Sequence, residues 1–251
     1  TSAGEYAIAL QWVILLRAVA GVLSGVLTPT IFSYYARGET ESLIRITKSA
    51  VKLLGLAIAL PVGLVCGLAP QLITVWVGEQ FIFLAPLMIV LTIHLTINLS
   101  VLPLFSINVA HNNVKIPGIL TFFTGFGNLA LAIVLPLLTG WGYYGIAIAG
   151  AIVLTLKNAL FTPWYATRVL NINGHAFTGS MLPGVAATAL IIVSSMMLGM
   201  TLPLGVSAVL VVAGSIITTA YVAIVWRFGL NRYERELFES YIPEKLRRNP
   251  I

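Results

Sequence analysis

Long runs of apolar residues dominate the chain and are separated by short polar or charged breaks. A helix that crosses the hydrocarbon core of a bilayer needs about 20 predominantly apolar residues. Runs of that length are longer than strands and are apolar on nearly every side, which favours helices. They cover residues 6–32, 50–69, 83–109, 117–139, 145–168, 181–199 and 203–226. The pattern predicts an all-α, polytopic transmembrane bundle with about seven spanning helices.

The composition excludes a soluble globular domain. Of the 251 residues, 59% are hydrophobic and only 9% are charged, whereas a typical soluble domain has about 45–50% apolar and about 25% charged residues. Cys66 is the single cysteine, so no intramolecular disulfide can form.

Basic residues gather on alternate connections, and this distribution predicts the orientation. Lys and Arg near the ends of spans are retained on the cytoplasmic side. The tail after Trp226 is basic, and so are the regions that follow the first, third and fifth runs, which carry Arg37, Arg45, Lys48, Lys52, Lys115 and Arg168. We therefore predict a multi-pass protein of the plasma (cytoplasmic) membrane, with an external N-terminus and a cytoplasmic C-terminus. The net charge of +6 then reflects topology and attraction to anionic membrane lipids, and no nucleic-acid partner is expected.

The sequence starts unlike a complete membrane protein. Thr1 is not an initiator Met, and the first apolar run follows almost at once without the charges or cleavage site of a signal peptide. We expect that transmembrane helices precede this segment, and that this N-terminal portion contributes to the functional site.

Two segments next to spans have an amphipathic pattern. In residues 41–54, apolar positions share one helical face and Arg45, Lys48 and Lys52 share another, with Glu41 placed to pair with Arg45. The pattern predicts a helix lying on the inner membrane surface before the chain turns into the next span. A comparable apolar stripe follows in the tail at Leu230, Tyr233, Leu237, Phe238 and Tyr241.

Arg17 and Lys157 lie deep within apolar runs. A cation at the middle of a span costs roughly 2.5–3.5 kcal/mol on insertion scales, so it normally faces protein, water or a ligand. Small residues share a helical face with Arg17, and modest ones with Lys157, so we expect both cations to point inward. Each either contacts the substrate or bonds a backbone carbonyl or a carboxylate of the preceding portion.

Uncharged polar residues mark the third and fourth runs. Thr92, Thr96 and Ser100 share one face and are expected to bond backbone carbonyls or neighbouring helices. His94 and Asn98 are also four residues apart. Together with Asn128, they are candidates for lining an aqueous passage. The alternative is that these side chains serve helix packing. Prolines that should bend the spans are Pro61, Pro86, Pro103, Pro136 and Pro163.

The absence of some residue types and motifs limits the classes of function that the chain can have. The sequence has no Asp, and its eight Glu residues lie outside the apolar runs, so the spans supply cations without carboxylates. A cavity lined by these spans would be positively charged and would therefore favour an anion. Nucleotide-binding, hydrolase and zinc motifs are absent, so no cofactor, metal or enzymatic activity is expected.

Short motifs occur in an order that resembles a known family. They are Gly4-Glu5-Tyr6-Ala7-Ile8-Ala9, Leu27-Thr28-Pro29, Tyr35-Ala36-Arg37-Gly38-Glu39, Ala110-His111-Asn112 and Gly140-Trp141-Gly142-Tyr143-Tyr144-Gly145-Ile146-Ala147. Together they are similar to the C-terminal half of polysaccharide-export flippases, the Wzx-like members of the multidrug/oligosaccharidyl-lipid/polysaccharide exporter superfamily. The resemblance implies a two-lobed transporter, in which residues 1–168 form five helices of the C-terminal lobe, residues 169–226 add two helices and residues 227–251 form a basic cytoplasmic tail.

The resemblance also implies a function. Such a flippase moves a lipid-linked oligosaccharide, a repeat unit on a polyprenyl pyrophosphate, for polysaccharide biosynthesis, and a polymerase or glycosyltransferases are possible partners. Arg17 and Lys157 are the candidates for binding the pyrophosphate, with His94, Asn98 and Asn128 for sugar or water. Two alternatives stay open: a multidrug or cation antiporter, which would need acidic cavity residues, and a membrane-embedded transferase, which would need a catalytic His or Asp at the surface.

Overall fold

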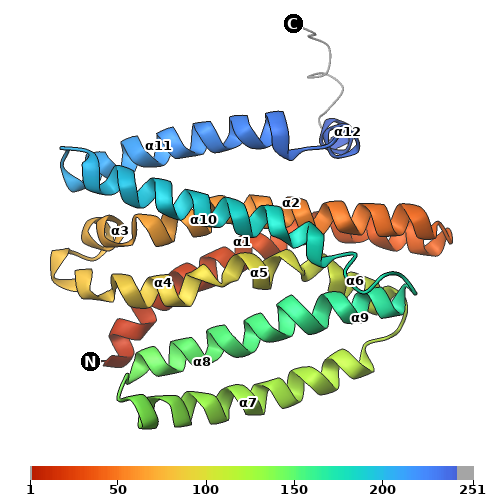
Figure 1. Cartoon of the computed structure of the whole chain (residues 1–251), viewed down its shortest axis with the longest axis horizontal. Helices are drawn as coiled ribbons and strands as arrows, with labels where there is room; N and C mark the ends of the chain where they lie inside the picture. The colour runs from red at the N-terminus through yellow and green to blue at the C-terminus, as the bar shows by residue number, and fades with distance from the viewer. Residues whose placement is uncertain (1, 242–251) are drawn as a thin grey trace, which may run out of the picture.

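The computed structural model describes residues 2–241, and every regular element in this range is helical (Figure 1). Seven helical segments are long and apolar enough to cross a membrane, which confirms the predicted number. They are Ala3–Ala36, Thr40–Gly67, Glu79–Ala110, Lys115–Thr139, Tyr143–Val169, Thr178–Thr201 and Val206–Gly229.

The spans lie side by side along the long axis, and their connections alternate between the two ends of the bundle (Figure 1). The start of α1 (Ser2–Ala36) lies at one end, and α12 (Arg232–Tyr241) lies toward the other. This arrangement fits an odd number of crossings. Which end faces the cytoplasm stays a prediction.

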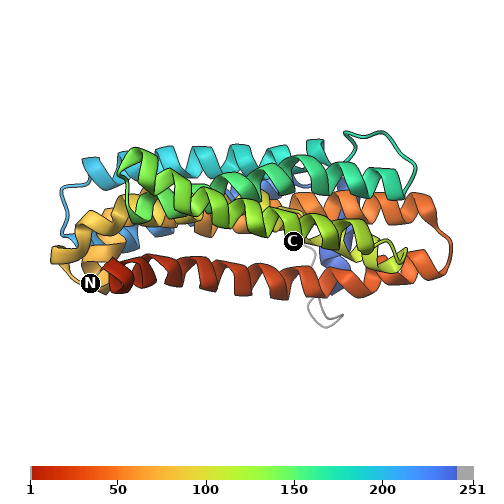
Figure 2. The same cartoon turned by 90° about the horizontal axis from the view of Figure 1, so that it is seen from below.

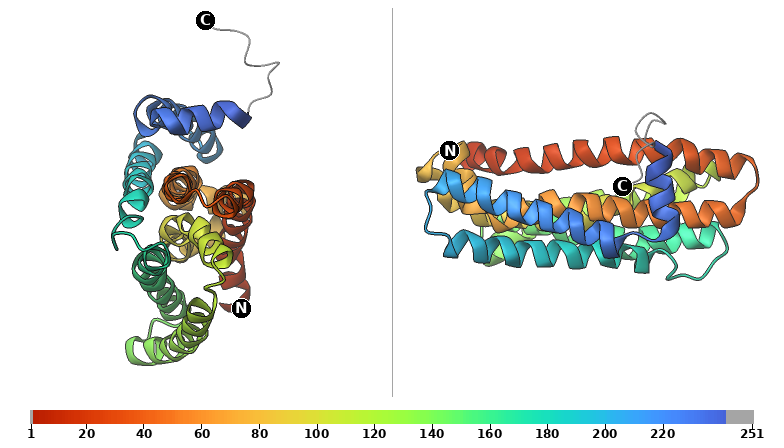
Figure 3. Two further views of the ribbon diagram at one scale, coloured as in Figure 1. Left: turned by 90° about the vertical axis from the view of Figure 1, so that its right-hand side faces the viewer. Right: turned by 90° about the horizontal axis from the view of Figure 1, so that it is seen from above.

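The central layer consists of α2 (Thr40–Gly67) and the third span. In the end view of Figure 3, α10 (Thr178–Thr201) and α11 (Val206–Ile224) lie on one side of this layer. On the other side lie α7 (Lys115–Thr139) and α8 (Tyr143–Leu156), which also cover the front of the view in Figure 2. No residue of α7 is buried, so this helix forms an edge of the described bundle.

Prolines coincide with interruptions in the third and fifth spans. The third divides into η1 (Glu79–Leu84), α4 (Ala85–Ile93), α5 (Leu95–Ser100) and α6 (Leu102–Ala110), with Pro86 and Pro103 in the first turns of α4 and α6. The fifth contains a π-helical turn, η2 (Lys157–Phe161), just before Pro163 in α9 (Thr162–Val169). Proline lacks a backbone N–H and clashes with the preceding turn, which explains the breaks next to Pro86, Pro103 and Pro163. The break at His94 has no adjacent proline. In contrast, α2 and α7 continue through Pro61 and Pro136.

The closest helix packing joins α2 to α10 through small residues. A Cβ atom added to Gly184 would lie 2.9 Å from the Cα of Gly55, and one added to Gly63 would lie 2.5 Å from the side chain of Ile191. Without a hydrophobic driving force between helices in lipid, such close approach gains dispersion contacts. The four-residue spacing of Gly55, Ala59, Gly63 and Gly67 carries this signal, which our sequence analysis missed.

The predicted surface helix at residues 41–54 is wrong. These residues form the first half of α2, which continues without a break to Gly67. Its apolar face, including Leu43, Val51 and Leu54, is buried against neighbouring helices. The amphipathic pattern therefore arises because the apolar face of this part of the spanning helix packs against other helices. The expected pair of Glu41 with Arg45 is also not among the ion pairs of the described residues, because Arg45 stacks over the ring of Tyr233, 4.9 Å from its centroid.

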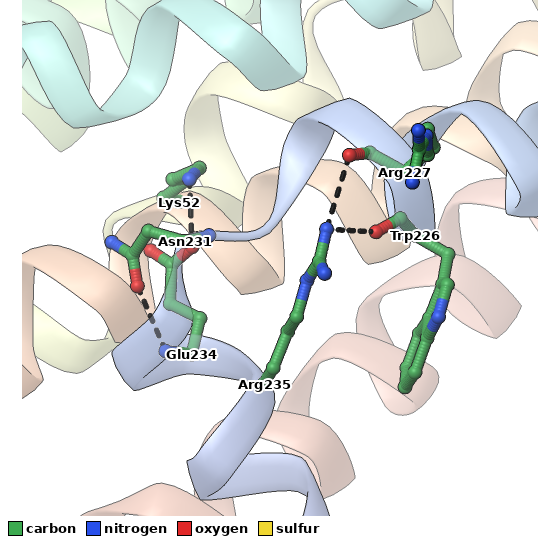
Figure 4. A network of polar contacts seen from close by, with 6 residues as sticks. All are labelled: Lys52, Trp226, Arg227, Asn231, Glu234 and Arg235. Carbon is green, nitrogen blue, oxygen red and sulfur yellow. Dashed lines mark hydrogen bonds and ion pairs between the residues drawn. The ribbon is translucent and has the colours of Figure 1, made fainter.

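A polar network fixes α12 against α2 (Figure 4). Lys52 on α2 donates a 2.7 Å hydrogen bond to the carboxylate of Glu234, which is only 1% exposed. The same carboxylate accepts a bond from the backbone N–H of Asn231, whose side chain caps the start of α12 in return. Arg235 donates to the carbonyl oxygens of Trp226 and Arg227, where the last turn η3 (Val225–Gly229) leaves carbonyls unpaired. The apolar stripe of the tail thus packs on protein through Tyr233 and Leu237, whereas the side chains of Phe238 and Tyr241 lie outside the described residues.

Gly184→Ala should destabilise the protein, because the added methyl group meets the backbone of Gly55 rather than a movable side chain. Overpacking of this kind costs about 1–3 kcal/mol, so the apparent midpoint of thermal unfolding in detergent should fall by several degrees. Gly125→Ala on α7 is the matched control, since a Cβ atom there meets nothing within 4 Å. Equal midpoints for the two variants would contradict the proposed close packing.

Candidate functional site

A chain of hydrogen bonds crosses the middle of the bundle between the third and fifth spans. The side-chain nitrogen of Asn98 lies 2.6 Å from Nδ1 of His94, so these two residues contact each other. Asn158 donates to Oδ1 of Asn98 at 2.9 Å and accepts a bond from the hydroxyl of Thr162 at 3.2 Å. Asn98, Asn158 and Thr162 are buried, and His94 is half-buried. The chain therefore runs from the interior toward an accessible imidazole.

Irregular backbone geometry places these side chains. His94 occupies the break between α4 and α5, and Asn158 lies in the π-helical turn η2. A π turn adds a residue to a helix and rotates the side chains that precede the bulge relative to those that follow it. Because His94, Lys157 and Asn158 are all near the middle of their spans, the breaks and the polar residues share one level of the membrane.

Arg17 lies near this chain, and the expectation that it points inward stays a prediction. Its side chain is exposed on α1, and its guanidinium is close enough to His94 for the two groups to interact electrostatically. Neighbouring Gly21 and Gly25 also have open space beside them. The face of α1 is therefore open at these two glycines, whereas Thr28 on the same face bonds Ser106 on α6 at 3.1 Å.

Lys157 is half-buried, and its side chain contacts residues other than those of the polar chain. Its ammonium donates a 2.8 Å hydrogen bond to the hydroxyl of Thr121 on α7 and lies 5.9 Å from the ring centroid of Phe105 on α6. The cation–π contact and the hydroxyl partly compensate for the water that the ammonium loses. Lys157 therefore has protein partners, but none of them carries a negative charge.

Asn128 is separate from the other candidates. Its Oδ1 is buried without a hydrogen-bond partner in the described structure and faces Gly150, where an added Cβ atom would lie 3.8 Å away. The residue thus lies between α7 and α8. The structure does not bring it to the chain of His94, Asn98 and Asn158.

Thr92 and Thr96 join helices as predicted. Thr92 donates to the carbonyl of Met88 and contacts Cys66, and Thr96 bonds Thr188 on α10 at 2.8 Å. Ser100 bonds the carbonyl of Ile97. In contrast, our sequence analysis missed Asn158 and Thr162. Their four-residue spacing beside Lys157 is the signal that could have indicated them.

The assembled site offers positive charge and hydrogen-bonding groups at the middle of the membrane. Arg17 supplies an accessible guanidinium, and His94 presents an imidazole backed by two buried amides. The described residues contain no group of three or more His, Cys, Asp or Glu side chains that could hold a metal. Such an arrangement suits an anion with polar substituents.

Comparison with known proteins agrees with a membrane protein of this kind. The chain is 39% identical over 187 residues to an uncharacterized membrane protein, EpsK, of Bacillus subtilis (strain 168). The match covers 74% of this chain and 37% of the Bacillus subtilis protein, so the chain spans well under half the length of that relative. No family model matches the sequence, and no solved structure matches it. The chain is thus a multi-pass membrane protein, and its seven apolar helices and this relative are consistent with a transporter.

Asn158→Ala should destabilise the bundle, because it leaves Oδ1 of Asn98 buried without its donor. An unsatisfied buried acceptor costs about 1–3 kcal/mol, which lowers the apparent midpoint of thermal unfolding. Asn128→Ala removes the same kind of side-chain amide, but Oδ1 of Asn128 has no hydrogen-bond partner in the described structure. The midpoint of thermal unfolding of this variant should therefore fall less. A larger effect at Asn128 would show that the chain through Asn98 does not hold the spans together.

Proposed function

We propose that this protein is a flippase that translocates a lipid-linked oligosaccharide across the plasma membrane for polysaccharide biosynthesis. The observation that carries the proposal is the exposed guanidinium of Arg17 at the middle of a span that has no carboxylate nearby in sequence. Holding a cation at this depth is costly. A phosphorylated passenger would offset that cost.

The proposed chemistry follows from the two kinds of cation. The planar guanidinium of Arg17 would bind two oxygens of the pyrophosphate at once, while Lys157 would add a point charge. His94 and Asn98 would bond the sugar or bound water, since their side chains form the accessible end of the polar chain. Asn128 was a candidate for the same role, but its position between α7 and α8 favours helix packing.

Alternating access would use the breaks in the third and fifth spans. Irregular turns at His94 and at residues 157–161 interrupt the regular backbone bonding of these spans at the level of the site. Broken helices at the level of a binding site occur in many secondary transporters. A preceding N-terminal portion of the same protein would complete the cavity around Arg17, and polymerases or glycosyltransferases would be the natural partners. Transport requires no catalytic step, so we propose no enzymatic activity.

Arg17→Ala and Lys157→Ala in the full-length protein should abolish surface glycan export, because each removes positive charge that the pyrophosphate would need at mid-membrane. Arg17→Lys should keep only part of the activity, since an ammonium cannot make the bidentate contact. Export is measured as surface glycan in a strain that depends on the protein, and expression as the amount in the membrane fraction.

The matched control is Arg232→Ala, which removes a cation whose side chain is 94% exposed at the end of the bundle. It should leave export unchanged. Normal export in both Arg17→Ala and Lys157→Ala, with normal membrane levels, would reject the assignment.

A further inference from the structure

A cavity of about 470 Å³ opens where α2, α10 and α12 meet, and Arg17 and Lys157 are not among its lining residues. Charged and polar side chains dominate its lining, among them Glu41, Arg45, Lys48, Lys52, Ser180 and Glu234. It lies at the end of the bundle that the basic residues predict to be cytoplasmic. None of the transport chemistry proposed above uses this cavity.

Contacts among the lining residues leave two cations available. Lys52 is neutralised by Glu234, which is 2.7 Å away. The guanidinium of Arg45 is held over the ring of Tyr233, which fixes its position without cancelling its charge. Lys48 has no ion-pair partner among the described residues. Glu41 remains as one opposing charge, so the cavity keeps a net positive charge.

The surroundings of the cavity indicate a ligand that is also partly apolar. A second cavity, of about 190 Å³, is lined by apolar residues of α2, α11 and the segment before α12. Along α2 the lining changes from Lys52 to Leu53, and before α12 it changes from Asn231 to Leu230. The two cavities are therefore lined by consecutive residues at two places in the chain.

We propose that the cavity of Arg45 and Lys48 binds the phosphate headgroup of an anionic phospholipid from the cytoplasmic leaflet, with an acyl chain beside the apolar cavity at Leu53 and Leu230. Basic pockets between helices on the cytoplasmic side are suited to such headgroups. The positive-inside rule requires only that basic residues lie on the cytoplasmic side. It does not require these cations to gather in one cavity beside a buried ion pair. The bound lipid would brace α12 against α2.

The test measures the phosphatidylglycerol retained by the full-length protein, using native mass spectrometry after transfer from nanodiscs of phosphatidylcholine and phosphatidylglycerol. Arg45→Gln combined with Lys48→Gln should reduce the retained phosphatidylglycerol about tenfold, because each cation near the surface contributes to anionic-lipid affinity. The single substitution Lys48→Arg keeps both positive charges, so this variant should retain as much phosphatidylglycerol as the native protein.

The matched control is Lys115→Gln combined with Arg168→Gln. It removes one Lys and one Arg at the same end of the bundle, and Arg168 also stacks on an aromatic ring, that of Trp164. Retention should match the native protein. Equal losses in both double variants, or no loss in either, would overturn the proposal.

A second arm separates a lipid headgroup from free phosphate. Phosphatidylglycerol should raise the apparent midpoint of thermal unfolding of the native protein, whereas inorganic phosphate should not. An equal rise with inorganic phosphate would overturn the lipid assignment. Arg17→Ala should leave lipid retention unchanged, so failure of this inference is distinguishable from failure of the proposed transport function.

Discussion

The hydrocarbon core of a membrane does not solvate polar groups, and this constraint explains most of the structure. Every spanning segment is helical because the backbone must satisfy its own hydrogen bonds. Where the helices break, at His94 and in η2, the polar side chains nearby are bonded to one another. The breaks and the polar chain therefore support each other, and they set the level at which chemistry can take place.

Two different kinds of helix contact hold the bundle around that level. At the interface of α2 and α10, glycines allow backbones to meet and dispersion supplies the energy. Between the third and fifth spans, amides and hydroxyls bond directly across the helices. On the far side, α7 contributes no buried residue. Arg17 on α1 is exposed, so this side of the candidate site is accessible within the described chain.

The two sites that we propose differ in how charge is managed. At mid-membrane, Arg17 has no carboxylate partner among the described residues, which keeps its charge available for an anion. At the end of the bundle, Lys52 is paired with the buried Glu234, and this pair fixes α12. A paired cation stabilises structure, whereas an unpaired one can bind a ligand. That distinction separates the residues expected to act on a passenger from those expected to organise the fold.

The sequence by itself determined the class of protein and the number of spans, because a bilayer of given thickness requires apolar runs of about 20 residues. It also placed His94 and Asn98 one helical turn apart, and the structure shows that their side chains meet. Only the tertiary structure decided that residues 41–54 continue into a span, that Arg17 is exposed and that Asn158 joins the polar chain. Amphipathicity shows which face of a helix is apolar, but whether lipid or protein covers that face depends on distant segments. The same physical limit applies to a mid-span cation, whose direction is set by the packing of its helix.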